Sequence, residues 1–108
     1  MKGTNLGEFQ ELVMLSILIL DDKAYGVSIQ EELNDRMKRS ISRGALQTAL
    51  SRLEEKGFIS SSYGEPTAER GGRRKRFYQV SNQGLETLKE AKELRENIWS
   101  VIPKLNAS

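Results

Sequence analysis

The residues of this chain with the clearest chemistry are five cationic side chains in the stretch 70–76, which reads RGGRRKR. The Gly-Gly pair and the alternating segment 77–80 that follows indicate a loop tip leading into a strand. Guanidinium and ammonium groups on such a tip can lie along a phosphate backbone or in a minor groove, where they fix register more than they read sequence. The candidate residues are Arg70, Arg73, Arg74, Lys75 and Arg76.

A second polar set lies upstream, in the stretch 42–57, which carries the signals of a helix. Ser42 can accept a hydrogen bond as the N-cap, and Gly57 can end the helix in the left-handed conformation with Phe58 as the apolar contact just beyond. The expected buried stripe of this helix is Leu46, Ala49, Leu50 and Leu53.

The arc opposite that stripe is polar and free of acid through its first three turns. The major groove of DNA admits one α-helix, in which Gln47 can pair with adenine and Arg43 or Arg52 with guanine. Gly44 leaves room for a close backbone approach. A merely solvated face is the alternative interpretation. The candidate DNA contacts on this helix are Ser42, Arg43, Gln47, Thr48, Ser51 and Arg52.

Two further helices must support these residues. Residues 9–20 are apolar all round, so we expect one face in the core and the other against a second subunit or the C-terminal helix. A buried strand is the alternative for this run. Ala24-Tyr25-Gly26 opens a second helix, with apolar residues at every fourth position, that should end near 36–38. Lys38, Arg39 and Tyr25 are weaker candidates for flanking phosphate contacts, and Tyr25 could equally be a packed aromatic.

The chain continues with a long-tipped hairpin and a last helix. Residues 59–63 and 74–80 alternate as strands around a turn at 64–72. Ser81 caps the last helix, and Pro103 should stop or kink it. Apolar residues recur along this helix in steps of three and four, which is typical of a seam that pairs with a partner. The expected dimer interface is Leu94, Ile98, Val101 and Ile102.

Together these elements predict a mostly α fold with a small β-hairpin wing. We expect a winged helix-turn-helix DNA-binding domain in residues 1–80 and a C-terminal dimerisation helix in residues 81–108, packed on the same core. A chain of 108 residues has the usual size of one domain.

Composition excludes most enzyme chemistry. The chain has no Cys and no His, so disulfides, thiolate or imidazole metal sites, and Ser-His or Cys-His nucleophile pairs are ruled out. We therefore expect no enzyme, no metal and no cofactor. The longest apolar run, 12–20, is about half the length of a membrane span, and no secretory signal is recognisable, so the expected location is the cytoplasm.

The net charge of +2 hides an uneven distribution. Residues 1–35 hold two Lys or Arg against seven acids, residues 36–76 hold eleven against four, and residues 77–108 are balanced. The central third is therefore strongly cationic, which favours a polyanionic partner at that segment.

The order and residues of these elements resemble the DNA-binding region of PadR-type transcriptional repressors over most of residues 6–88. The resemblance implies a dimeric winged-helix repressor with its third helix in the major groove, its wing on the DNA backbone, and C-terminal helices that pair the subunits. The matching pieces are Leu6-Gly7, Ala24-Tyr25-Gly26, Ser42 through Gly57-Phe58-Ile59, and Gly72 through Gly84, read GRRKRFYQVSNQG.

One departure concerns Gln47-Thr48, since the family commonly has Tyr-Pro after the position of Leu46. The operator could therefore differ from the family's usual one. Because the chain stops at Ser108, it resembles the short branch without a separate C-terminal domain, and an effector would bind near the dimer interface. Trp99 could sandwich a small aromatic effector there. Its alternative role is to anchor the last helix onto the first helix of either subunit.

Two other functions remain open from the sequence. One is a winged-helix module for protein–protein interaction, in which the wing serves solubility and the last helix engages a partner. The other is RNA binding through the wing, which the lack of an aromatic platform disfavours because Phe77 and Tyr78 fit strand positions.

Overall fold

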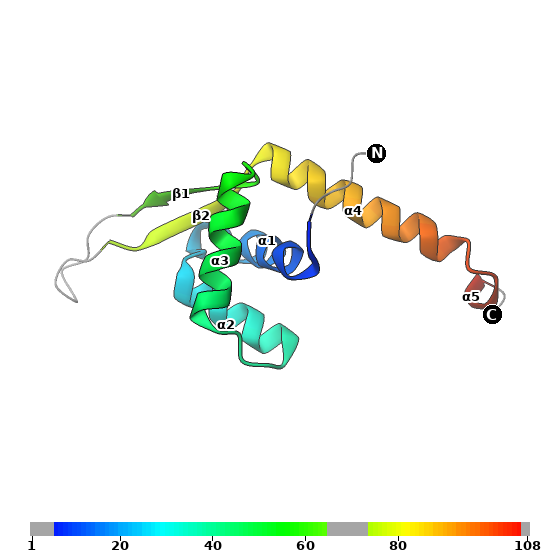
Figure 1. Cartoon of the computed structure of the whole chain (residues 1–108), viewed down its shortest axis with the longest axis horizontal. Coiled ribbons are helices and arrows are strands. Elements are labelled where there is room, and N and C mark those ends of the chain that lie inside the picture. The colour runs from blue at the N-terminus through cyan, green and yellow to red at the C-terminus, as the bar shows by residue number, and fades with distance from the viewer. Residues whose placement is uncertain (1–5, 65–73, 107–108) are drawn as a thin grey trace.

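The computed structural model describes residues 6–64 and 74–106 of the chain. The helices α1 (Glu8–Leu20), α2 (Gly26–Met37) and α3 (Arg43–Glu55) come first, with the short 3₁₀ turn η1 (Asp21–Lys23) between α1 and α2. The strands β1 (Ile59–Tyr63) and β2 (Arg76–Val80) follow, and then the long helix α4 (Asn82–Ser100) and the short helix α5 (Pro103–Asn106). Figure 1 shows the hairpin and α4 leaving the body formed by α1, α2 and α3 in opposite directions.

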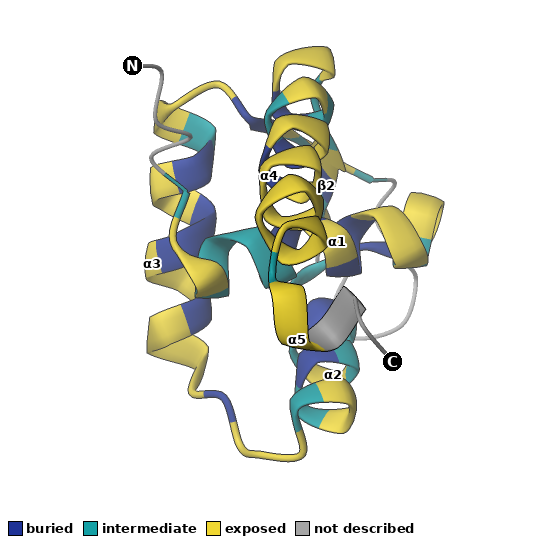
Figure 2. Ribbon diagram, turned by 90° about the vertical axis from the view of Figure 1, so that its right-hand side faces the viewer, coloured by how far each residue is buried: buried dark blue, intermediate teal, exposed yellow. Residues whose placement is uncertain are grey.

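The core lies where α1, α2 and α3 meet, and the first residues of the hairpin close it. Figure 2 shows buried segments on the inner sides of these helices and exposed segments along the outer part of α4. Each fully buried aliphatic side chain contributes about 1.5–3 kcal/mol relative to an exposed one. The innermost residues are Val13, Met14, Ile17, Ile29, Leu33, Leu46, Leu50 and Leu53.

The apolar run 9–20 forms a helix, as its periodicity predicts, and the strand alternative is wrong. Val13 and Ile17 are buried on one side of α1. Leu18 and Ile19 are 42% and 53% exposed on the other side. The expectation that one face enters the core is therefore confirmed. On the second face, Met14 is fully buried next to Gly84 of the last helix, whereas Leu18 and Ile19 remain exposed in the single chain.

The helix α3 begins and ends at the residues that the sequence indicates. The Ser42 hydroxyl accepts a hydrogen bond of 3.0 Å from the Ala45 N–H, which satisfies a free donor of the first turn. Gly57 has φ of 79°, a conformation in which a side chain would be strained, and Phe58 is buried just beyond it. The stripe predicted from Leu46 to Leu53 is the buried face of α3.

The hairpin is antiparallel, with Ile59 opposite Val80 and Tyr63 opposite Arg76. A short bridge between Tyr25 and Phe77, together with the Tyr78 N–H that donates to the Ala24 carbonyl at 2.9 Å, ties β2 to the segment before α2. The wing is thus fixed to the body along its inner strand. The second strand begins at Arg76, two residues later than the expected 74–80.

The start of α4 is anchored to the two residues that precede β1. The Ser81 hydroxyl accepts a bond from the Gly84 N–H at 3.0 Å and donates to the Gly57 carbonyl at 2.6 Å. Gly84 packs so tightly that an added Cβ would lie 2.1 Å from the Phe58 carbonyl oxygen. The helix ends at Ser100 and Pro103 opens α5, so the predicted stop before this proline is confirmed.

The arrangement is a winged helix fold: mostly helical, with a two-strand hairpin after the third helix and a long C-terminal helix. This confirms the predicted fold class. In the part of the chain that the structure describes, no helix combines the length and the apolar character that crossing a bilayer would need.

Candidate nucleic-acid interface

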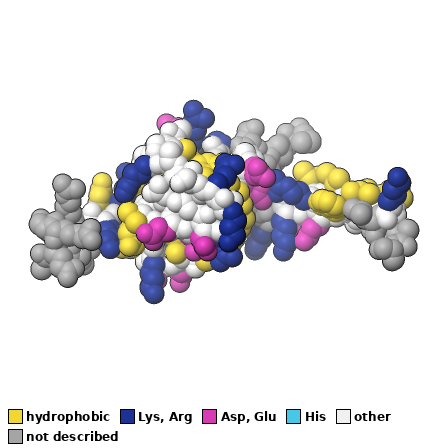
Figure 3. All heavy atoms as spheres, turned by 90° about the horizontal axis from the view of Figure 1, so that it is seen from below, with side chains coloured by type: hydrophobic (Ala, Val, Ile, Leu, Met, Phe, Trp, Pro, Cys, Tyr) yellow, Lys and Arg dark blue, Asp and Glu magenta, His cyan; other side chains and the backbone are white. Residues whose placement is uncertain are grey.

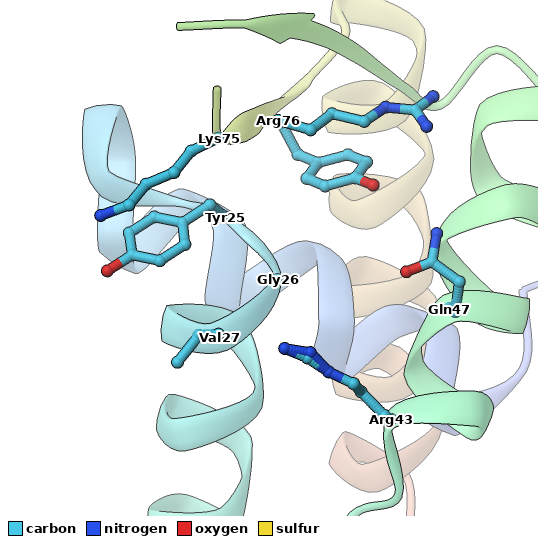
Figure 4. Close-up of a pocket in the computed structure, with 8 residues that line it drawn as sticks. Tyr25, Gly26, Val27, Arg43, Gln47, Lys75 and Arg76 are labelled. Atoms are coloured by element: carbon cyan, nitrogen blue, oxygen red, sulfur yellow. The ribbon is translucent and has the colours of Figure 1, made fainter. Parts of the chain in front are cut away.

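An open pocket lies between the beginning of α2, the first half of α3 and the base of the wing. Figure 4 shows that the side chains of Arg43 and Gln47 reach from α3 toward the loop at Tyr25 and Gly26, with Lys75 on the far side. The polar side of α3 and the base of the wing therefore face the same space. This pocket, called here the interface pocket, is lined by Tyr25, Gly26, Val27, Arg43, Gln47, Lys75, Arg76 and Tyr78.

The predicted polar arc of α3 is exposed along its whole length, but its members do not all face the interface pocket. Arg43 and Gln47 line the pocket, one turn apart on the same edge of the helix. Arg52, five residues after Gln47, lies about 140° further around the axis, on the opposite edge. The exposed residues between these edges are Gly44, Thr48, Ser51 and, in the last turn, Glu55.

Gly44 presents an open stretch of helix backbone at the start of α3. A Cβ built at this position meets no atom within 4 Å. Packing among the described residues therefore does not require a glycine here, in contrast to Gly84. A large partner could approach the backbone at this point, as the sequence suggests.

Tyr25 is both a packed aromatic and part of the interface pocket. Its ring meets Phe77 edge-on, with centroids 5.6 Å apart and planes at 67°. The Lys75 Nζ lies 4.2 Å from the centroid of the same ring, within the range of a cation–π contact. The stack holds the Lys75 ammonium beside the pocket while leaving the side chain exposed.

Among the described cations of the wing, Arg76 is the one whose guanidinium is directed toward α3 and hydrogen-bonded to it. Its Nη2 donates to a Glu54 carboxylate oxygen at 2.9 Å, and its Nε donates to the Ser61 hydroxyl at 2.9 Å. Among the neighbouring cations, Arg74 is exposed at the end of the described hairpin. Arg70, Arg73 and the Gly71-Gly72 pair lie outside the described residues.

Lys38 and Arg39 lie at the far end of α2 from the interface pocket. Both are exposed, and Lys38 ends the helix in the left-handed conformation with φ of 56°. Arg39 shares a second depression with Ser42 and Ala45. Ala45 lies about 160° around α3 from Gln47, so Arg39 flanks the opposite side of the helix start.

The outer part of α4 exposes an apolar surface, which Figure 3 shows as hydrophobic side chains on the arm that leaves the body. Trp99 is 60% exposed there, and Val101 is 73% exposed. Ile102 is half-buried. The expected interface residues Leu94 and Ile98 belong to this surface as well.

The sequence did not predict Gly26, Val27 and Tyr78 as lining residues of the interface pocket, nor Glu54 and Ser61 as partners of Arg76. Gly26 and Val27 line the interface pocket because α2 begins there. Glu54 forms an ion pair with Arg76, whereas its place in the last turn of α3 gave no indication of a partner. The strand alternation of 74–80 gives the sequence signal for this inward position of Arg76, since it puts Arg76 on the same face as the buried Tyr78.

Residues 14–90 match the model of the transcriptional regulator PadR-like family. An uncharacterised protein of Lysinibacillus sphaericus is 34% identical over 87 residues, which cover 75% of this chain and 77% of that protein. A transcriptional regulator of Clostridium thermocellum is 31% identical, with a TM-score of 0.67 over 89% of this chain and 88% of that one.

A PadR family transcription regulator of Clostridium difficile is 27% identical, with a TM-score of 0.66 over 90% of this chain and 97% of that one. The family model spans well over half of the sequence, and its range includes α2, α3, both strands and the start of α4. The chain therefore belongs to the PadR-like family of transcriptional regulators, whose members bind DNA.

Proposed function

We propose that this chain is a dimeric, sequence-specific DNA-binding repressor. In this proposal α3 enters the major groove, and the wing follows the DNA backbone or the minor groove. The observation that carries the proposal is the interface pocket, around which Arg43 and Gln47 of α3 and Lys75 of the wing face one open side. One duplex could meet the helix and the wing together on that side.

The proposal assigns different tasks to the two parts of the surface. Gln47 and Arg43 have the groups that pair with base edges, and Thr48 and Ser51 are exposed beside them. Lys75 and Arg74 suit phosphate contacts, and Tyr25, Lys38 and Arg39 suit flanking ones. Residues 1–80 would then form the DNA-binding domain and residues 81–108 the dimerisation helix.

Selection of duplexes from a random pool, with an RNA pool as competitor, tests this function. The bound sequences should contain two half-sites roughly 34 Å apart, since twofold-related helices read the groove one turn apart. If each subunit neutralises about four phosphates, log affinity should fall against log salt with a slope of roughly −7 for the dimer. Enrichment of no duplex, or preferential capture of RNA, would refute the proposal. A reporter gene placed behind the selected site distinguishes repression from activation.

A small planar aromatic effector is a further part of the proposal. Trp99 is 60% exposed, and no ring contact covers it within the described residues. Two copies of its indole related by the dimer axis could enclose a flat ring. Planar aromatic compounds should then quench Trp99 fluorescence and weaken binding to the selected duplex. A screen in which no compound does both would remove the effector from the account.

A further inference from the structure

Arg76 belongs to a closed hydrogen-bonded network that joins the wing to the last turn of α3. The Ser61 hydroxyl accepts from Arg76 Nε at 2.9 Å and donates to Glu54 Oε2 at 2.7 Å. The other carboxylate oxygen of Glu54 accepts from Arg76 Nη2 at 2.9 Å. Each of the three side chains therefore contacts the other two, across three different elements.

The strand pairing explains why Arg76 takes this position. Successive side chains of a strand point to opposite faces, so Arg76 shares its face with Tyr78, which is 4% exposed in the core. Ser61 stands opposite Tyr78 in the register and brings its hydroxyl to the same face. This face of the hairpin is the one that packs against α3, where Glu54 is half-buried.

The surroundings of the guanidinium strengthen the network. Its carbon lies 5.6 Å from the Tyr78 ring centroid and 6.0 Å from that of Tyr63, within or at the limit of cation–π range. The exposed fraction of the Arg76 side chain is 41%, and that of Glu54 is 33%. A charge held by a carboxylate in this way adds no free cation to the surface that meets DNA.

We propose that Glu54, Ser61 and Arg76 act as a clamp that sets the angle between the wing and α3, so that Arg76 positions the wing and does not itself contact phosphate. This inference rests on the proposed function, because the angle matters when one duplex must meet α3 and the wing together. In this proposal an acidic residue, Glu54, contributes to specific DNA binding, although the surface itself was identified by its cations.

The two roles for Arg76 predict opposite effects of Glu54→Gln. Loss of the clamp should weaken binding to the selected duplex about two- to fivefold, the range expected for a partly exposed ion pair, with the salt slope unchanged. A phosphate-binding Arg76 would instead be released by Glu54→Gln. Binding would then tighten, and the salt slope would steepen by about 0.9 for each subunit.

The control is Glu55→Gln, which removes the same charge from the next position of α3, where the side chain is exposed. Ser61→Ala and Ser62→Ala form a second pair without any change of charge, and Ser62 is exposed on the other face of β1. If the clamp exists, Ser61→Ala should lower the affinity for the selected duplex, and Ser62→Ala should leave it unchanged. Equal effects within each pair, or tighter binding by Glu54→Gln, would overturn the clamp.

A measurement on the free protein, without DNA, tests the clamp independently of the proposed DNA-binding function. The Gly64 N–H donates to the Lys75 carbonyl at 2.8 Å at the outer end of the described hairpin, and its hydrogen exchange reports on the wing. Exchange should be about two- to fivefold faster in Glu54→Gln than in Glu55→Gln, with α3 core amides unchanged. Equal exchange would refute the clamp itself. Failure of the wild type to prefer any duplex, with this exchange difference present, would refute the proposed function alone.

Discussion

Arg43 and Gln47 are exposed polar residues on a helix whose other face is buried, and neither side chain forms a hydrogen bond or ion pair within the described residues. Both line the interface pocket, opposite Lys75. Lys75 in turn is held over the Tyr25 ring, which restricts where its charge can be. At the scale of single residues, the surface therefore combines two groups able to read bases with a cation in a defined place.

Gly44→Ala separates binding from stability at this surface. The site is helical and sterically open, so the added methyl should leave the free protein unchanged or stabilise it by up to about 0.5–1 kcal/mol. If the helix backbone approaches DNA here, the same methyl should weaken specific binding by about 1 kcal/mol or more. Urea unfolding and titration of the selected duplex provide the two measurements. Unchanged affinity would show that the backbone stays away from the groove at Gly44.

Much of the residue-level picture could be predicted from the sequence, because caps and periodicity are local signals. Ser42, Gly57 and the buried stripe of α3 are where those signals place them. The role of Arg76 could not be predicted, since a run of cations gives no indication of which one meets an acid. That choice depends on the register between β1 and β2 and on the docking of both strands against α3.

At the scale of elements, the start of α4 is held by a close approach that only glycine permits. The Phe58 carbonyl oxygen would lie 2.1 Å from a Cβ at position 84, and the Met14 methyl 2.9 Å from it. Further along α4, Arg95 forms an ion pair of 2.7 Å with Glu11 of α1. These contacts fix the direction in which α4 leaves the body.

Gly84→Ala should therefore destabilise the protein although alanine favours helices. The clash with the Phe58 backbone should cost about 1–3 kcal/mol, more than the helix propensity gained. Gly44→Ala is the matched control, because it makes the same change near the start of another helix in open space. Thermal or urea unfolding of both variants checks this prediction. Equal stability of the two variants would mean that α4 adjusts without cost.

The order of the elements could be predicted from the sequence, but their positions relative to one another could be predicted only in part. Alternation and turn residues indicate a hairpin, and a heptad seam indicates a helix with a partner. The bridge between Tyr25 and Phe77 and the tight contact at Gly84 join segments that are distant in the sequence. Such contacts depend on three-dimensional packing, for which one sequence gives no local signal.

At the scale of the whole molecule, the described residues leave apolar side chains exposed on α1 and on the outer part of α4. On α1, Leu15 and Leu18 form a groove with Leu88 of α4. The outer arm of α4 has no fully buried residue after Ala91 among those described. A helix segment without tertiary packing is marginal in water, so the dimer remains our prediction for what covers it.

Membership of a family of transcriptional regulators also confirms that the chain is not an enzyme, as the lack of His and Cys predicts. The cationic third of the sequence, residues 36–76, contributes α3, β1 and the first residue of β2. Of the described cations in this third, Arg43, Lys75 and Arg76 line the interface pocket, and the others lie elsewhere on the surface.

In our proposal α3 reads bases while the wing contacts the DNA backbone on the same surface. The most direct test compares the affinities of Gln47→Ala and Arg74→Ala for the selected duplex and for random duplexes. We expect Gln47→Ala to lose about 1–3 kcal/mol of preference at particular base pairs while its salt slope stays the same. Arg74→Ala should weaken binding to all sequences alike and lower the slope by about 0.9 for each subunit. If both variants shift specific and random binding identically, the division between a reading helix and a backbone-binding wing is contradicted.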